Sequence, residues 1–289
     1  MEKRKPTIFL AGDSTVQSYG KERAPLTGWG MALHEYFQEK TTRRAAASDS
    51  RFEQAVLYET DGVFIDNRAM AGRSCRSFFD EGRLDDIENS MREGDYLFAQ
   101  FAHNDANKAK EERYVTPDQY EDYLLRYDAA ARRHKAQLVL VTAIAMRSFG
   151  DGEDRVYDVG EKVLKQAVPE AGKEIPEKKT REAHGEGYCE ISFPEYRDRM
   201  LSMAQKYDIP LLDLGLATAK YCSMLGPEKT KEIFLWTAPG EYPAYPEGKE
   251  DNAHLKLKGA EEFARILAGL IAGWDKDARL DALKRWLAV

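Results

Sequence analysis

The chain has 289 residues and a formal net charge of −7, with 43% hydrophobic and 32% charged residues. This balance is ordinary for a globular protein, and the length suits one well-filled α/β domain or two small ones. The negative charge gives no general attraction to nucleic acid or to an anionic membrane. No apolar stretch approaches the roughly 20 residues that a membrane-spanning helix needs. We therefore expect neither a nucleic acid nor a membrane as a partner.

Two further features concern the cellular compartment. The first residues, 1–6, run into the first predicted strand without an apolar leader region. Cys75, Cys189 and Cys222 form an odd, scattered set without the spacing of metal ligands, which is typical of a reducing compartment. These features favour a cytoplasmic protein, and we expect no metal and no cofactor.

Short apolar runs alternate with helical patterns along the first half of the chain. The run from Ile8 to Ala11 stops abruptly at Gly12, as a buried parallel strand does when it enters a tight turn. Residues 41–54 are small and polar and are expected to form a loop or an insertion. The remaining strands expected in this half are 63–67, 96–101 and 138–142, and the expected helices are 31–38, 84–91 and one that begins with a capping box at Thr116–Gln119.

The second half opens with a long charged, glycine-rich stretch, 146–191, which is too long for an ordinary connector and is expected to be a lid, a binding loop or a mobile excursion. A capping box is expected at Ser192–Glu195, followed by a helix and a fifth strand at 209–214. Residues 237–250 are expected to be loop. A long amphipathic helix follows His254, and leucines 280, 283 and 287 indicate one more.

This alternation predicts the fold class. Strands separated by helices favour a three-layer α/β/α, flavodoxin-like doubly wound arrangement with a parallel sheet of about five strands. No internal repeat or convincing linker divides the chain. We expect a single domain over residues 1–289, with insertions near 41–60 and 146–191.

Polar residues follow three of the predicted strands where each one ends. They are Gly12-Asp13-Ser14, Ala71-Gly72-Arg73 and His103-Asn104-Asp105. Because the carboxyl ends of parallel strands share one edge, these turns are expected to converge on one crevice. A serine hydroxyl is a poor nucleophile until a base takes its proton, so the turn alone favours Asp13 or Ser14 as a helix cap.

A fourth polar group, Asp251-Asn252-Ala253-His254, lies just before the C-terminal helix. A carboxylate three residues before a histidine can reach its ring in a turn, fix one tautomer and stabilise the imidazolium. The order Ser…Asp…His occurs in several known triads and does not by itself decide among them.

The four groups together resemble the four sequence blocks of the SGNH (GDSL-type) hydrolases. Within that superfamily, residues 12–16, 71–74 and 100–105 most resemble the rhamnogalacturonan acetylesterases. The resemblance implies that Ser14 is the nucleophile, His254 the base and Asp251 the residue that orients it. It also implies an oxyanion hole made of the Ser14 and Gly72 N–H groups and the Asn104 side-chain amide.

Two departures from the family pattern bear on substrate. The third block usually has glycine where this chain has Ala102, and the two insertions exceed what the smallest members carry. The Ala102 methyl could be tolerated or could narrow the crevice, and the two insertions are expected to reshape the substrate cleft. His103, Asp13 and Asp105 read as supports of their own turns.

Substrate contacts are expected from a positive rim and from aromatic residues. Arg68, Arg73 and Arg76 cluster around the second block, and Arg147 matches an arginine that the acetylesterases carry after the fourth strand. They could receive sugar carboxylates or could pair with the chain's own acids, and both interpretations remain open. The aromatic candidates for the cleft are Trp236, Tyr242 and Tyr245.

We therefore expect a serine esterase that removes acetyl groups from carbohydrate, with pectin- or rhamnogalacturonan-derived oligosaccharides as its substrate. One alternative is a lipase or thioesterase on the same fold, which would have an apolar acyl channel. Another is a catalytically silent protein that binds carbohydrate.

Overall fold

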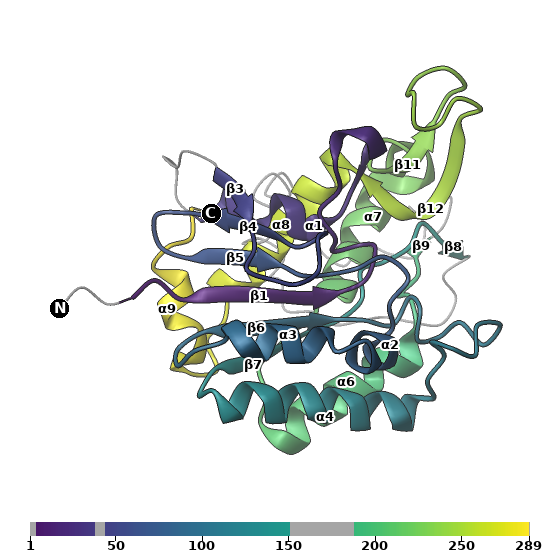
Figure 1. The fold of residues 1–289 in the computed structure, drawn as a ribbon. Helices are drawn as coiled ribbons and strands as arrows, with labels where there is room; N and C mark the ends of the chain where they lie inside the picture. The colour runs from purple at the N-terminus through teal and green to yellow at the C-terminus, as the bar shows by residue number, and fades with distance from the viewer. Residues whose placement is uncertain (1–3, 38–43, 151–187, 289) are drawn as a thin grey trace.

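The computed structural model describes residues 4–37, 44–150 and 188–288. A seven-stranded sheet forms its centre, in the order β10-β7-β6-β1-β5-β4-β3 (Figure 1). Its strands are β1 (Thr7–Gly12), β3 (Arg44–Ala47), β4 (Val56–Glu59), β5 (Phe64–Asn67), β6 (Tyr96–Gln100), β7 (Gln137–Val141) and β10 (Leu211–Leu212).

The strands β5, β1, β6, β7 and β10 pair in parallel. Numbered along the chain among themselves, they follow the 2-1-3-4-5 order of flavodoxin-like doubly wound folds. The expected α/β class and parallel sheet are confirmed. In such a sheet ligands lie outside the carboxyl ends of the strands, next to the point where the order reverses, which here is the end of β1.

The segment expected to be a loop or an insertion, 41–54, contributes a strand to the sheet, so the loop interpretation is wrong for residues 44–47. β3 pairs antiparallel with β4, and β4 pairs antiparallel with β5. Residues 41–43 lie outside the described part of the chain. The Arg-Ala-Ala-Ala sequence of β3 has little strand propensity of its own, so pairing with the neighbouring strand decides its conformation.

Helices cover both faces of the sheet (Figure 1). One face carries α1 (Trp29–Ala32), the 3₁₀ helix η2 (Leu33–Tyr36), α7 (Leu214–Thr230), α8 (Leu257–Ala272), the 3₁₀ turn η4 (Ala278–Leu280) and α9 (Asp281–Lys284). The other face carries α2 (Cys75–Asp80), α3 (Arg83–Ser90), α4 (Pro117–Arg133) and α6 (Pro194–Tyr207).

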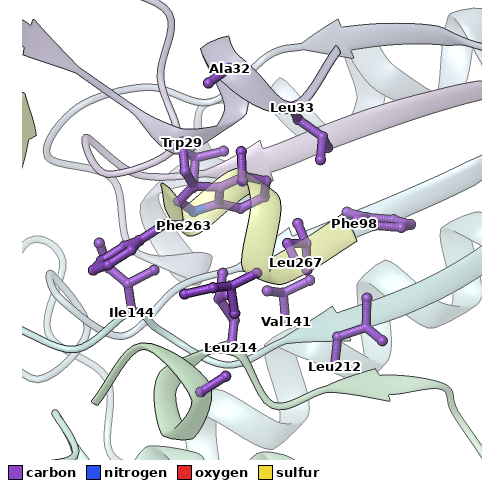
Figure 2. Packing of buried hydrophobic residues seen from close by; sticks show 14 of the residues in the cluster. Trp29, Ala32, Leu33, Phe98, Val141, Ile144, Leu212, Leu214, Phe263 and Leu267 are labelled. Atoms are coloured by element: carbon purple, nitrogen blue, oxygen red, sulfur yellow. The ribbon is translucent and has the colours of Figure 1, made fainter. Parts of the chain in front are cut away.

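The two-residue period of β1 explains the two cores. Ile8 and Leu10 point into the cluster that includes α1 and α8, whereas Phe9 and Ala11 point into the cluster beneath α2 and α4. Figure 2 shows part of the first cluster, which includes Trp29, Phe263 and Leu267. A strand buried on both faces must be apolar throughout, as this sequence is.

Several helix predictions hold and several need correction. The capping box at Thr116 is present: its side chain accepts a hydrogen bond from the Gln119 N–H, and the Gln119 side chain accepts one from the Thr116 N–H. The capping box expected at Ser192 is wrong, because the residue that precedes α6 is Phe193 and the Ser192 hydroxyl accepts from the Met146 N–H instead, at 2.7 Å.

The boundaries of three further elements differ from expectation. The first helix begins at Trp29, before the predicted 31–38, and tightens to 3₁₀ at Leu33. The strand expected at 209–214 is only Leu211–Leu212, and α7 begins at Leu214. Asp213 accepts a hydrogen bond from the Leu216 N–H at 3.4 Å and so starts the helix that the apolar run had hidden.

A small three-stranded sheet, β11-β12-β2, flanks the main one. It is formed by β2 (Leu26–Thr27), β11 (Phe234–Thr237) and β12 (Lys249–Lys256). The expected loop 237–250 is therefore shorter, with its ends in β11 and β12. The residues Asp251 to His254, expected in a turn, lie within β12.

The long stretch 146–191 is described only at its two ends. There β8 (Phe149–Gly150) pairs with β9 (Tyr188–Cys189). The rest of the predicted lid or binding loop, 151–187, lies outside the described residues.

Candidate active site

A tight turn at the end of β1 carries Ser14. The Asp13 carbonyl accepts hydrogen bonds from Val16 and Gln17, and its carboxylate accepts from the Thr15 N–H at 2.9 Å and the Thr15 hydroxyl at 2.7 Å. A Cβ on Gly12 would lie 2.6 Å from Val16 Cγ2, so only glycine allows the chain to turn this tightly. Asp13 is fully buried. It therefore holds the turn, as expected, and leaves the neighbouring serine half-exposed.

His103 supports the same turn. Its Nδ1 lies 3.1 Å from Asp13 Oδ2, and its ring meets Phe193 edge-on at 5.1 Å between centroids. Burial alone would raise the pKa of Asp13, but the adjacent His103 and the hydrogen bonds from Thr15 hold that pKa below its usual value. His103 and Asp13 thus hold the turn that carries Ser14 in place.

The structure brings Ser14, His254 and Asp251 into one hydrogen-bonded chain. His254 Nε2 lies 2.9 Å from Ser14 Oγ, and His254 Nδ1 lies 2.8 Å from Asp251 Oδ2. The other Asp251 oxygen accepts from the backbone N–H groups of His254 at 3.0 Å and Ala253 at 2.9 Å. Although burial would raise the pKa of Asp251, these bonds and the His254 ring lower it well below the usual range. The carboxylate thus stays ionised and orients the imidazole toward the serine.

The turns after β1, β5 and β6 are tied to one another by hydrogen bonds. The Met70 N–H donates to the Gly12 carbonyl at 3.0 Å, and Asn104 Nδ2 donates to the Arg73 carbonyl at 3.0 Å. Asp105 accepts from the Cys75 N–H at 2.9 Å and from the Ala102 N–H at 3.0 Å. The turns that carry Ser14, Gly72 and Asn104 therefore meet at one edge of the sheet, because β5, β1 and β6 are parallel neighbours and these bonds join their turns.

Arg147 holds in place the segment of β12 that carries Asp251 and His254. The Arg147 N–H donates to the Asn252 carbonyl at 2.6 Å, and its guanidinium donates to the Pro227 carbonyl at 2.8 Å. Trp236 Nε1 donates to Asn252 Oδ1 at 3.0 Å, and the Arg147 guanidinium lies 4.8 Å from the Trp236 ring centre. Two of the residues expected to contact substrate are thus engaged with the strand that carries the histidine.

Arg73 and Tyr242 are also placed by protein contacts. Arg73 donates to Glu81 at 3.0 and 3.1 Å and to the Ala71 carbonyl at 2.9 Å, with 27% of its side chain exposed. Tyr242 forms an isolated bridge with Tyr245 in the loop before β12. Arg68, by contrast, is buried with Asp66 and Asp86, which removes it from any substrate rim. Contacts of Arg73, Arg147, Trp236 and Tyr242 with a substrate stay predictions.

Three residues near the site were not predicted from the sequence. Arg113 donates to the Gly72 carbonyl at 3.2 Å, Gln17 accepts from the Ala71 N–H at 2.6 Å, and Tyr19 donates to the Ser14 carbonyl at 2.8 Å. Arg113 and Gln17 lie outside the sequence blocks, so no local pattern marks them. Among the described residues, no three acidic, histidine or cysteine side chains are grouped as a metal site would require.

Comparison with known proteins identifies the family to which this chain belongs. Residues 8–267 match the GDSL-like Lipase/Acylhydrolase family. The chain belongs to this family. Like its other members, this esterase is a carboxylic ester hydrolase, and the predicted family resemblance is confirmed.

Two curated relatives come from Bacillus subtilis strain 168. Rhamnogalacturonan acetylesterase RhgT is 31% identical over 93% of this esterase and 90% of its own length. Probable rhamnogalacturonan acetylesterase YesY is 29% identical, with 90% of each chain covered. The match therefore extends over nearly the whole chain.

Solved structures share the fold. The esterase aligns with the B. subtilis protein YxiM with a TM-score of 0.61 and 20% identity, over 93% of this chain but 56% of that one. It aligns with Axe2, an acetylxylan esterase from Geobacillus stearothermophilus, with a TM-score of 0.52 and 13% identity over 93% and 95% of the two chains. Within the described residues, no helix has the length and apolar character to cross a membrane.

Proposed function

We propose that this esterase removes O-acetyl groups from carbohydrate, with rhamnogalacturonan-derived oligosaccharides as its substrate, through a Ser14–His254–Asp251 triad. The observation that carries the proposal is the continuous hydrogen-bonded chain from the serine hydroxyl through the imidazole to the carboxylate. The names of the curated relatives at 31% and 29% identity support the acetyl and sugar parts of the proposal.

The geometry accounts for the first half of the reaction. His254 Nε2 accepts the Ser14 proton while Ser14 Oγ attacks the acetyl carbonyl carbon, and the carbonyl oxygen becomes an oxyanion. Asp251, held ionised, stabilises the imidazolium that forms. The imidazolium then donates its proton to the sugar oxygen as the C–O bond breaks, which leaves acetyl on Ser14 and frees the sugar hydroxyl.

The second half returns the enzyme to its starting state. A water molecule gives its proton to His254 and attacks the acetyl-serine carbonyl, after which the proton passes back to Ser14 Oγ and acetic acid leaves. In both halves the oxyanion would be stabilised by the N–H groups of Ser14 and Gly72 and by the Asn104 amide. In the described part of the chain neither of these two backbone N–H groups has a protein acceptor.

Hydrolysis of p-nitrophenyl acetate and butyrate, with Ser14→Ala and His254→Ala as comparisons, tests the chemistry. We expect preference for acetate and a loss of at least about 10⁴-fold in kcat in both variants. Acetate release from acetylated rhamnogalacturonan and xylan oligosaccharides then tests the sugar. Faster turnover of longer acyl chains would favour a lipase or thioesterase, and a wild type as inert as both variants on every ester would favour a sugar-binding protein.

A further inference from the structure

The turn that carries Gly72 has two possible backbone arrangements, and the structure selects one. The Arg73 N–H donates to the Met70 carbonyl at 3.2 Å and closes a four-residue turn. Gly72, its third residue, has φ +79°, whereas Ala71 is not among the described residues with positive φ. This combination defines a type II turn, in which the central peptide faces roughly opposite to that of a type I turn.

That central peptide joins Ala71 to Gly72, so it contains the Gly72 N–H. Rotation of this one peptide would reverse the direction of the Gly72 N–H while leaving the ends of the turn in place. Glycine at this position has no side chain to oppose such a rotation. The direction of the N–H therefore needs support from elsewhere.

Arg73 supplies a hydrogen bond to the other end of the same peptide. Its Nη1 donates to the Ala71 carbonyl at 2.9 Å. Glu81 fixes the guanidinium by accepting from Arg73 Nε at 3.0 and 3.1 Å. The Arg73 and Arg83 hydrogen bonds outweigh partial burial and lower the pKa of Glu81, which keeps this anchor ionised.

The adjacent carbonyls are held in the same way. Arg113 donates to the Gly72 carbonyl at 3.2 Å, and Asn104 donates to the Arg73 carbonyl at 3.0 Å. The Ala71 N–H is occupied by Gln17 at 2.6 Å. In the described structure the Gly72 N–H is thus a donor without a protein acceptor in a turn whose other polar groups are bonded.

We propose that Arg73 is a positioning residue of the oxyanion hole: it locks the Ala71–Gly72 peptide so that the Gly72 N–H faces the reacting carbonyl. A cationic donor on the peptide carbonyl also withdraws electron density from the amide, which makes its N–H a stronger donor to a developing negative charge. The inference rests on the proposed function, since it takes the Gly72 N–H as an oxyanion donor. It requires no contact between Arg73 and substrate.

The test compares Arg73→Gln and Arg73→Lys with a matched control, Arg133→Gln. Arg133 is also an arginine paired with a glutamate, Glu88, but it lies at the last turn of α4, away from the site residues. We expect Arg73→Gln to lower kcat for p-nitrophenyl acetate about tenfold with KM within about twofold, because one oxyanion donor is weakened and none is deleted. Arg73→Lys keeps the charge and should lose less, and Arg133→Gln should match the wild type.

Two readouts separate positioning from general structural damage. The rate at which p-nitrophenyl ethylphosphonate labels Ser14 uses the same oxyanion donors and should fall in Arg73→Gln by the same factor as kcat. In protein labelled with ¹⁵N-glycine, the Gly72 amide signal should shift in Arg73→Gln and stay in place in Arg133→Gln. A lower melting temperature with unchanged kcat and an unchanged Gly72 signal would overturn the inference.

Labelling by the phosphonate distinguishes failure of the proposed function from failure of the Arg73 inference. If the phosphonate does not label Ser14 of the wild type, the proposed function fails and the role of Arg73 falls with it. If Ser14 is labelled equally fast in the wild type and in Arg73→Gln, the triad stands and only the Arg73 inference is refuted. A combined Arg73→Gln, Asn104→Ala variant should lose less than the product of the two single losses, because both act on one oxyanion.

Discussion

The buried carboxyl of Asp105 should make the stability of this protein depend on pH. Asp105 is fully buried and links the second and third turns through the Cys75 and Ala102 N–H groups. Burial is the main cause that raises its pKa from 3.8 to about 7. Between these two pH values the folded chain holds a proton that the unfolded chain has lost. The stabilisation is therefore complete below about pH 4 and is lost as the pH rises through 7.

The size of this effect follows from the shift. At 1.36 kcal/mol per pKa unit, a rise from 3.8 to about 7 corresponds to about 4 kcal/mol of unfolding free energy, of which about 3 kcal/mol is lost between pH 5 and pH 8. Asp105→Asn stays neutral and removes this dependence. The new amide NH₂ faces a backbone N–H, which costs about 1–3 kcal/mol at every pH.

Urea unfolding of the wild type and Asp105→Asn at pH 5, 6.5 and 8 measures the difference. We expect the variant to gain about 3 kcal/mol of unfolding free energy relative to the wild type between pH 5 and pH 8, and to be the more stable protein at pH 8. Asp122→Asn removes an exposed carboxylate of α4 and serves as the control. A difference between wild type and Asp105→Asn that stays constant within about 0.5 kcal/mol across this range would refute the reasoning.

Three further substitutions test the site and its supports. Asn104→Ala should lower kcat about 10²–10³-fold with little change in KM, and steady-state kinetics in which only KM rises would remove Asn104 from the oxyanion hole. Arg147→Ala deletes the side-chain hydrogen bonds to Asn252 and to the Pro227 carbonyl, so we expect the unfolding free energy to fall by about 2 kcal/mol and kcat to fall as well. An unchanged kcat would limit Arg147 to a structural role. Ala102 has φ 136°, which costs a non-glycine residue about 1–3 kcal/mol. The substitution Ala102→Gly relieves this strain but loses about 0.8 kcal/mol with the buried methyl and about 0.7 kcal/mol to glycine's extra chain entropy in the unfolded state. The unfolding free energy should therefore rise by less than about 1.5 kcal/mol. Clear destabilisation in urea would contradict this.

The sequence predicts those parts of the fold where a local pattern and its tertiary environment agree. The parallel strands are apolar on both faces because helices cover both faces, so their sequences identify them directly. The turns after β1 and β6 need small or polar residues at fixed positions, and Gly12 and Asn104 were identified on that basis. Ser14 and His254 could be paired only through the family resemblance, since nothing local to either residue points to the other.

The missed elements are those for which distant contacts decide the conformation. β3 is specified by pairing with β4, and the short β10 by pairing with β7. α7 was not predicted, because its first residues continue an apolar run that is typical of a strand. Likewise, no sequence pattern shows that Arg147 reaches Asn252 or that Arg113 reaches Gly72, because these bonds span 105 and 41 residues of chain.

The position of His254 on β12 has a consequence for synthesis of the protein. Ser14 and His254 are 240 residues apart in sequence, and β12 pairs with β2, which directly follows the serine turn in the chain. A growing chain thus exposes its serine long before the histidine leaves the ribosome. In the proposed triad, the serine would acquire its base only when one of the last segments to be made docks against one of the first. Hydrolytic turnover would then serve as a direct assay of complete folding during refolding or translation.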